Sequence, residues 1–224
     1  MSTDVAPLLV IFDCDGVLVD SEPIASRVLA EVLTESGFPL TPAQAIERYT
    51  GISLPAVLAR IESEWGRNLP KGFVAHLGER DRAAFRAELQ AVAGVAEMLG
   101  ELSMLRCVAS SGTLGKIRGS LDITGLLPYF QPHLFSAEMV VRGKPAPDLF
   151  LLAADRMGSP PERCVVVEDS VAGVQAGCAA GMRVLGFCGG GHANPGSAAS
   201  LRAAGAATVF DRMADLPALL NRQQ

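Results

Sequence analysis

The stretch LLVIFDCDGVLVDSE, residues 8–22, sets the pattern of the fold. Its first five residues are all apolar, and the run ends at an acidic residue, Asp13. A short, continuous apolar run is typical of a strand that is buried on both faces of a parallel sheet. A second acidic residue, Asp15, and a glycine, Gly16, follow at once. Because ligands of open parallel sheets bind beyond the carboxyl ends of the strands, we expect this strand end to carry chemistry.

Similar apolar runs recur along the chain and alternate with longer helical patterns. The alternation predicts an α/β fold built on a doubly wound parallel sheet, with helices on both faces. We interpret the glycine-rich stretch 189–204 as loops. The remaining strands are predicted at 105–109, 133–135, 164–167, 184–188 and 207–210, and the helices between them at 95–102, 114–121, 147–157 and 171–180.

The chain departs from this alternation after the first strand, where four helical patterns follow one another without a convincing strand between them. We interpret this segment as a helical domain, residues 21–91, inserted into a core domain made of residues 1–20 and 92–224. The four helices are predicted at 22–36, 42–49, 54–65 and 71–89.

Composition narrows the class of protein. Hydrophobic residues make up 49% of the 224 residues, which allows a sizeable core, and the formal net charge is -5. The absence of a run of Lys and Arg disfavours nucleic acid as a partner, and no apolar stretch approaches the roughly 20 residues of a membrane span. None of the five cysteines forms a C-x-x-C pair. We therefore expect a cytoplasmic protein with reduced cysteines, no nucleic-acid or membrane partner, and a monomeric or weakly homo-oligomeric state.

Two pairs of acidic residues follow predicted strands. Asp13 and Asp15 can face one site if the chain stays extended, and their mutual repulsion favours a cation between them. Glu168 and Asp169 end the most apolar strand, and carboxylates of this kind suit Mg²⁺. The alternatives are an Asp-rich turn for the first pair and the start of a helix for the second.

A pair of hydroxyl groups lies at a further strand end, and a lysine lies nearby, just before a predicted helix. Ser110 and Ser111 follow a predicted strand and open a helix, where hydroxyl and N–H groups can bind an anion. Lys144 stands before two prolines in the segment GKPAPD, residues 143–148, and can balance carboxylates and phosphate oxygens. An ordinary helix cap and a surface lysine are the alternatives.

Four motifs in this order resemble those of the haloacid dehalogenase superfamily. The resemblance covers nearly the whole chain and is greatest to the branch with a helical cap after the first strand, which includes β-phosphoglucomutase and many sugar phosphatases. That branch carries its cap where this chain has its helical insertion. The motifs are DCDGVLVDSE at 13–22, VASSG at 108–112, GKPAPD at 143–148 and VVVEDSVAGVQAG at 165–177.

The resemblance implies a role for each motif. Asp13 is implied as the nucleophile that forms an aspartyl-phosphate, and Asp15 as the general acid and base. The Ser110 hydroxyl and the Ser111 amide are implied to hold phosphoryl oxygens, while Lys144 links Asp13 to the phosphate. The implied Mg²⁺ ligands are Asp13, the backbone carbonyl of Asp15 and Asp169, with support from Glu168.

The same resemblance ranks the possible reactions. Asp15 disfavours carbon–halogen cleavage, which needs no proton for the leaving group. A mutase of this branch has an arginine where this chain has Leu54 and a histidine where it has Ala25, which favours a phosphatase. We expect a small phosphorylated metabolite as substrate, a sugar phosphate or sugar-acid phosphate. A phosphomutase and a catalytically silent sugar-phosphate-binding protein are the alternatives.

The helical domain offers two further candidates for substrate binding, Arg48 and Gly51. Arg48 can meet a carboxylate or a second phosphate of the substrate, although a solvated helix position is the plainer interpretation. His76, His133 and His192 have no partner at a spacing typical of a metal site or a catalytic triad, so we assign them no role.

Overall fold

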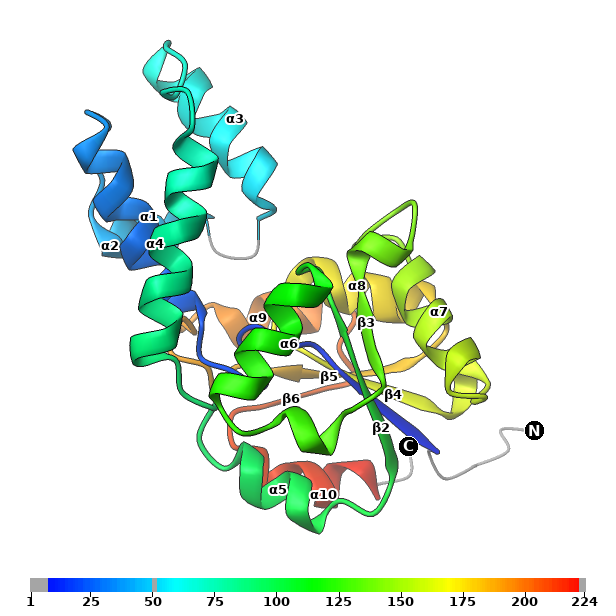
Figure 1. Cartoon of the computed structure of the whole chain (residues 1–224). Coiled ribbons are helices and arrows are strands. Elements are labelled where there is room, and N and C mark those ends of the chain that lie inside the picture. Colours follow the sequence, from blue (N-terminus) through cyan, green and yellow to red (C-terminus); the bar gives the residue numbers. More distant parts are fainter. Residues whose placement is uncertain (1–7, 50–51, 222–224) are drawn as a thin grey trace. The chain divides into compact units, whose positions relative to one another are not determined.

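A six-stranded parallel sheet confirms the predicted doubly wound α/β fold in the computed structural model, which describes residues 8–49 and 52–221. The strand order is β3-β2-β1-β4-β5-β6, so β1 has β2 on one side and β4 on the other. Figure 1 shows the strands side by side between two sets of helices. The strands are β1 (Leu9–Phe12), β2 (Leu105–Ser110), β3 (Leu134–Ser136), β4 (Cys164–Glu168), β5 (Arg183–Phe187) and β6 (Thr208–Phe210).

Helices cover both faces of the sheet, as the alternation predicts. α7 and α8 lie together on one side, whereas α5 and α10 meet on the other through a short 3-10 turn, Met213–Asp215 (Figure 1). Within the described residues, the α-helices that accompany the sheet are α5 (Val95–Glu101), α6 (Leu114–Ile123), α7 (Asp148–Arg156), α8 (Val171–Ala179), α9 (Ser197–Ala203) and α10 (Leu216–Leu220).

Two of these helices differ from the sequence interpretation. α9 lies inside the stretch 189–204 that we interpreted as loops, and α10 was not predicted. Both are short, and in α9 Leu201 alone is buried. Helical periodicity needs a window of about 11–18 residues, so helices of this length leave little signal in the sequence.

Alternate side chains of β1 pack on opposite faces of the sheet, as the pleat of a strand requires. Leu9 and Ile11 join a cluster with buried residues of α7, α8 and α9, among them Phe150. Phe12 instead packs against Phe130 in a T-shaped arrangement, with 5.8 Å between the ring centroids. Burial of β1 on both faces places its last residue, and Asp13 after it, at the centre of the α/β unit.

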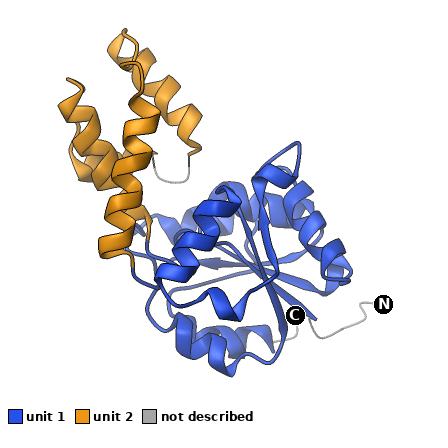
Figure 2. Cartoon of the chain, viewed as in Figure 1, with its two compact units in different colours: residues 1–20, 90–224 blue, residues 21–89 orange. Residues whose placement is uncertain are grey.

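In a second compact unit, residues 21–89, helices are the only regular elements among the described residues (Figure 2). It has its own core, to which Val28, Leu33, Phe38 and Ile61 contribute. We propose that this unit is the cap domain that the sequence predicts. Its helices are α1 (Glu22–Glu35), α2 (Pro42–Tyr49), α3 (Leu54–Trp65) and α4 (Phe73–Glu88).

The second boundary of the helical unit lies two residues before the predicted one. Gln90 and Ala91 belong to the α/β unit, which comprises residues 1–20 and 90–224. The Asp20 N–H donates to the Gln90 carbonyl at 3.0 Å, and the Val92 N–H donates to the Leu18 carbonyl at the same distance. These bonds join the segment that leads into the helical unit to the segment that follows it. Residues 90–92 therefore pair with the α/β unit before α5 begins.

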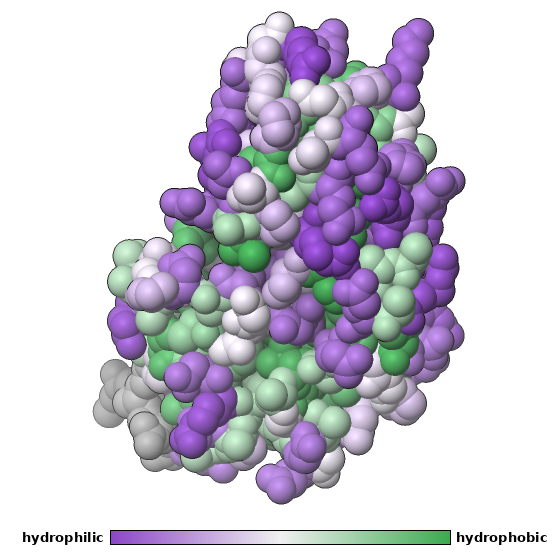
Figure 3. Space-filling model, turned by 90° about the vertical axis from the view of Figure 1, so that its left-hand side faces the viewer, coloured by the Kyte–Doolittle hydropathy of each residue, from purple (hydrophilic) through white to green (hydrophobic). Residues whose placement is uncertain are grey.

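The surface that Figure 3 shows has hydrophilic and hydrophobic residues interspersed, without one dominant apolar area on that face. Exposed large apolar side chains come from separate segments, such as Leu105 and Val141. Among the described residues, every helix is too short or too polar to cross a membrane.

Candidate active site

The end of β1 places Asp13 between two neighbouring strands. The Asp13 N–H donates to the Val167 carbonyl of β4 at 3.0 Å, which continues the pairing of the two strands past the end of β1. On the other side, Phe12 pairs with Val108 of β2, so Ser110 and Asp13 belong to the same edge of the sheet. Asp13 is 8% exposed. The main chain thus fixes a nearly buried carboxylate at this edge.

Lys144 links the carboxylates of two strand ends. Its Nζ atom lies 2.9 Å from Asp13 Oδ1 and 2.6 Å from Glu168 Oε1. The lysine side chain is 4% exposed, and Nζ lies 4.9 Å from the centroid of the Phe150 ring. A buried ammonium is stable here because two carboxylates and an aromatic face replace the water it has lost.

Burial and charge shift the proton affinities of this cluster. Burial, opposed by the Lys144 charge, raises the pKa of Asp13 to about 8. Burial likewise raises the pKa of Asp169 to about 6, against a hydrogen bond from His192. For Lys144, burial favours the neutral amine, but the charges of Asp13 and Glu168 outweigh it and hold the pKa above its usual range. Such shifts are typical of functional sites.

The donor set suits a small divalent cation. Asp13, Glu168 and Asp169 each offer a carboxylate oxygen, and these atoms lie within 4.8 Å of one another. Three clustered carboxylates exceed the single charge of Lys144, so a cation relieves their repulsion. Hard oxygen donors of this kind are the ones that Mg²⁺ prefers. Asp13, Glu168 and Asp169 therefore fit the ion, and the predicted role of the Asp15 backbone carbonyl stays a prediction.

Glu168 is better placed to support a metal than to bind one directly. The residue is fully buried, and its Oε1 atom accepts from Lys144. Its Oε2 atom accepts from both the N–H and the hydroxyl of Ser170 at 2.9 Å. Because both oxygens already have donors, Asp13 and Asp169 are the stronger candidates for direct ligands.

Asp15 has a partner that the sequence interpretation missed. Its Oδ2 atom lies 3.0 Å from the Nζ atom of Lys116 in α6, and the two side chains are 17% and 41% exposed. Thr113 caps this helix by accepting the Lys116 N–H at 3.2 Å, so Lys116 stands in the first turn. A lysine in the first turn of a helix that starts at the reactive sheet edge is a signal that the sequence offered.

The two predicted phosphate-binding serines differ in exposure. Ser110, the last residue of β2, is buried, and its hydroxyl accepts the Gly112 N–H at 3.3 Å. Ser111 is exposed. Both residues lie at the same edge of the sheet as Asp13, which suits the binding of phosphoryl oxygens. These two roles stay predictions.

His192 also has a partner that sequence spacing did not reveal. Its Nε2 atom lies 3.1 Å from Asp169 Oδ2, and the histidine side chain is 9% exposed. Sequence spacing suggested no partner for His192, and the structure shows one. The two residues are far apart in sequence, and the pairing of β4 with β5 brings the loops that follow these strands together.

The candidates of the helical domain are only partly described. Arg48, in α2, forms an ion pair with Glu64 and lies over the Tyr49 ring, with 5.3 Å from guanidinium carbon to ring centroid. Gly51 lies outside the described residues. A role for either in substrate binding stays a prediction.

Comparisons with known proteins agree with this geometry. The family described as haloacid dehalogenase-like hydrolase matches residues 8–181. The chain is 38% identical to the 6-phosphogluconate phosphatase of Escherichia coli K12, over 83% of this chain and 85% of that protein. It is 33% identical to hexitol phosphatase A of the same organism, over 78% and 80% of the two chains. A solved haloacid dehalogenase-like protein of unknown function from Agrobacterium tumefaciens has a TM-score of 0.87 and 41% identity, and the match covers 95% of this chain and 97% of that one.

The structure and the comparisons lead to one conclusion. The parallel sheet carries an acidic cluster at the end of β1, the family match covers most of the chain, and the relatives include named phosphatases. The chain is an enzyme of the haloacid dehalogenase-like hydrolase family.

Proposed function

We propose that this protein is a Mg²⁺-dependent phosphatase that hydrolyses a small phosphorylated metabolite through an aspartyl-phosphate on Asp13. The observation that carries the proposal is the contact of Lys144 with Asp13 and Glu168, beside the Asp169 carboxylate, at one edge of the sheet. The similarity to two enzymes named 6-phosphogluconate phosphatase and hexitol phosphatase A supports the same activity.

In the first step, a carboxylate oxygen of Asp13 attacks phosphorus, and the bond from phosphorus to the leaving oxygen breaks. Asp15 donates a proton to that oxygen, which leaves as an alcohol. Lys144 offsets the repulsion between the carboxylate and the phosphate. A bound Mg²⁺ supplies further positive charge where negative charge develops. Asp13 and Asp169 would hold this ion.

In the second step, water attacks the phosphorus of the aspartyl-phosphate. Asp15, now a carboxylate, accepts the proton of that water. The bond from phosphorus to Asp13 breaks, and inorganic phosphate and the Asp13 carboxylate result. Covalent capture thus replaces one difficult hydrolysis with two displacements.

The test of this proposal uses p-nitrophenyl phosphate and a panel of phosphorylated metabolites, with Mg²⁺ and with EDTA. We expect turnover that EDTA abolishes and added Mg²⁺ restores. Asp13→Asn removes the nucleophile and should lower kcat by roughly 10³-fold or more, with an unchanged circular dichroism spectrum. Full turnover by the folded Asp13→Asn protein would exclude the aspartyl-phosphate route.

The same assay separates the alternatives. A phosphomutase converts β-glucose 1-phosphate to glucose 6-phosphate when a trace of bisphosphate is present, whereas we expect free phosphate. Leu54 and Ala25, at positions where the mutase resemblance requires an arginine and a histidine, favour the phosphatase. A silent binding protein would bind the sugar phosphate without turnover.

For the substrate class, we propose a phosphorylated sugar acid. Asp15 must come within about 2.6–3.2 Å of the leaving oxygen to protonate it. The Lys116 ammonium, 3.0 Å from Asp15, then lies on the leaving-group side and suits a carboxylate of the substrate. The similarity to a 6-phosphogluconate phosphatase supports this class.

The substrate class is tested with Lys116→Met on 6-phosphogluconate and on sorbitol 6-phosphate, which lacks the carboxylate. A lost charge contact of about 1.4 kcal/mol should lower kcat/KM roughly tenfold more for the acid than for the alditol. An equal loss for both substrates would show that Lys116 does not recognise the carboxylate.

A further inference from the structure

His192 belongs to a loop that none of the four sequence motifs includes. The loop follows β5 and contains three consecutive glycines, 189–191, before the histidine. The His192 side chain is nevertheless 9% exposed, and its Nε2 atom lies 3.1 Å from Asp169 Oδ2. A nearly buried imidazole that contacts a candidate metal ligand needs an explanation beyond the packing of a surface loop.

The loop is anchored to the segment that follows β1. The Gly191 N–H donates to Asp20 Oδ1 at 2.9 Å. At Gly190, a Cβ atom would lie 2.9 Å from the Gly16 carbonyl oxygen and 3.0 Å from the His192 ring. At Gly16, where φ is +77°, a Cβ atom would lie 2.0 Å from Asp169 Oδ2. Because Gly16 and Gly190 have no side chains, three segments of the chain can meet around the Asp169 carboxylate.

We propose that His192 is a positioning residue that holds the Asp169 carboxylate in place for a divalent cation. The inference rests on the proposed Mg²⁺ site. The imidazole Nε2–H donates to Oδ2, and the second oxygen of the carboxylate remains for the ion. Hydrogen bonds of this kind fix the rotamer of a ligating carboxylate, and their loss typically weakens metal affinity about 10–100-fold. The hydrogen bond from the Gly191 N–H to Asp20 holds the loop where His192 can reach Asp169.

The test measures cation affinity directly on the EDTA-stripped full-length protein, without substrate. Binding of Mn²⁺ is followed by the loss of its free-ion EPR signal, and Mg²⁺ affinity is obtained by competition. His192→Leu keeps the apolar volume but removes the donor, so we expect Kd to rise about 10–100-fold. His192→Gln retains an N–H donor at similar reach and should stay within a few-fold of the wild type. His76→Leu, in the helical unit, is the control and should not change Kd.

Asp20 provides a second pair of variants if His192→Leu does not fold. Asp20→Ala removes the acceptor of the Gly191 N–H and should weaken Mn²⁺ binding, whereas Asp20→Asn keeps an oxygen acceptor and should bind nearly as the wild type does. Wild-type affinity in both His192→Leu and Asp20→Ala would overturn the proposal, as would equal losses in His192→Leu and His192→Gln. The phosphatase proposal is judged separately by turnover, so an active wild type with a cation affinity insensitive to His192 refutes only the positioning role.

Discussion

At the scale of single residues, the candidate site is a balance of buried charges. Lys144 contacts Asp13 and Glu168 while His192 contacts Asp169, so each acidic residue of the cluster has a nitrogen partner. Burial, with a smaller contribution from neighbouring carboxylates, raises the pKa of Asp13 and Asp169. The same cluster that disfavours ionised acids in the metal-free protein therefore favours a cation.

A dependence of stability on pH follows from the Asp13 pKa. The pKa of Asp13 is about 8 in the folded protein, whereas an Asp side chain in the unfolded chain has its ordinary value of 3.8. Between these values the folded state keeps a proton that the unfolded state has lost, so the free energy of unfolding of the metal-free protein should fall as pH rises from about 4 to about 8. Asp169 acts in the same direction up to about pH 6. Mg²⁺ binds the ionised carboxylates and should therefore stabilise the protein more at pH 8 than at pH 5.

Urea unfolding at pH 5 and pH 8, with EDTA or with Mg²⁺, checks this expectation. Asp13→Asn is the matched control, because an amide does not titrate and the EDTA series should lose much of its decline. A decline of equal size in wild type and Asp13→Asn would assign the effect to other groups.

At the scale of elements, the site depends on how strand ends are braced by the segments around them. The Ser136 hydroxyl, at the end of β3, donates to the Gly112 carbonyl at 2.7 Å. Glu138 accepts the Leu114 N–H at 2.9 Å and so holds the start of α6. At the end of β4, Ser170 caps α8 and also donates to Glu168. The ends of β2 and β4 are thus braced by contacts at the start of the helices that follow them.

The packing of α8 against Glu168 yields a prediction. At Gly173, a Cβ atom would lie 1.8 Å from Glu168 Oε1, so Gly173→Ala must displace a fully buried carboxylate that holds Lys144. We expect a destabilisation of about 1–3 kcal/mol, as for other overpacked sites, and a loss of turnover. Gly119→Ala in α6 meets no atom within 4 Å and should stabilise the protein by about 0.5–1 kcal/mol.

Urea denaturation and phosphatase assays of both variants check these expectations. Normal turnover by Gly173→Ala would mean that Glu168 can move without cost to the site.

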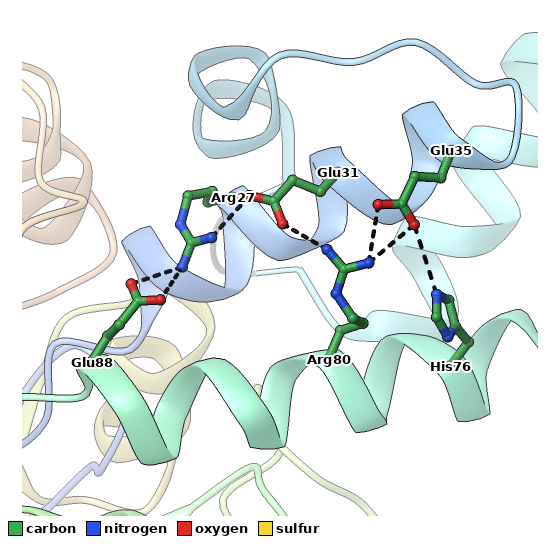
Figure 4. Close-up of polar contacts among 6 residues, drawn as sticks. All are labelled: Arg27, Glu31, Glu35, His76, Arg80 and Glu88. Atoms are coloured by element: carbon green, nitrogen blue, oxygen red, sulfur yellow. Dashed lines mark hydrogen bonds and ion pairs between the residues drawn. The ribbon is translucent and has the colours of Figure 1, made fainter.

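At the scale of the whole molecule, two units have separate cores, and the helical unit is reinforced by a network of ion pairs. Figure 4 shows how Arg27 and Arg80 link α1 to α4. Arg80 contacts both oxygens of Glu35 at 3.0 Å and Glu31 at 3.0 Å. Arg27 contacts both oxygens of Glu88 at 2.8 Å. A single exposed ion pair contributes little to the free energy of unfolding, but a network of such pairs can add to the apolar contacts and orient α1 and α4.

Separate cores predict separate responses to mutation. Arg80→Met should increase amide hydrogen exchange in residues 21–89 while exchange in the α/β unit stays unchanged, because the two units need not open together. Arg86→Met is the control, since Arg86 lies on α4 but joins none of the ion pairs found among the described residues. Hydrogen exchange with mass spectrometry reports both units at once. A rise of similar size in both units would show that the chain opens as one cooperative body.

Much of the fold and of the site was determined by the sequence itself. The apolar runs that end in Asp13, Ser110 and Glu168 became β1, β2 and β4, and four helical patterns in the insertion became α1 to α4. These features follow from local rules, because a buried strand or an amphipathic helix is written in consecutive residues. The acids at the ends of β1 and β4 and the serines at the end of β2 could be grouped because parallel strands all end at one edge, wherever they stand in the sequence. Lys144 was grouped with them through its motif, GKPAPD.

The tertiary structure alone decided which side chains meet. His192 contacts Asp169 because β5 lies beside β4 and a loop of glycines lets the backbone approach Gly16. Lys116 contacts Asp15 because α6 starts at the end of β2, next to β1. The sequence does place Lys116 in the first turn of a helix at this edge, but neither pairing can be read from periodicity or spacing. A loop conformation and the order of strands depend on packing between segments that are distant in sequence.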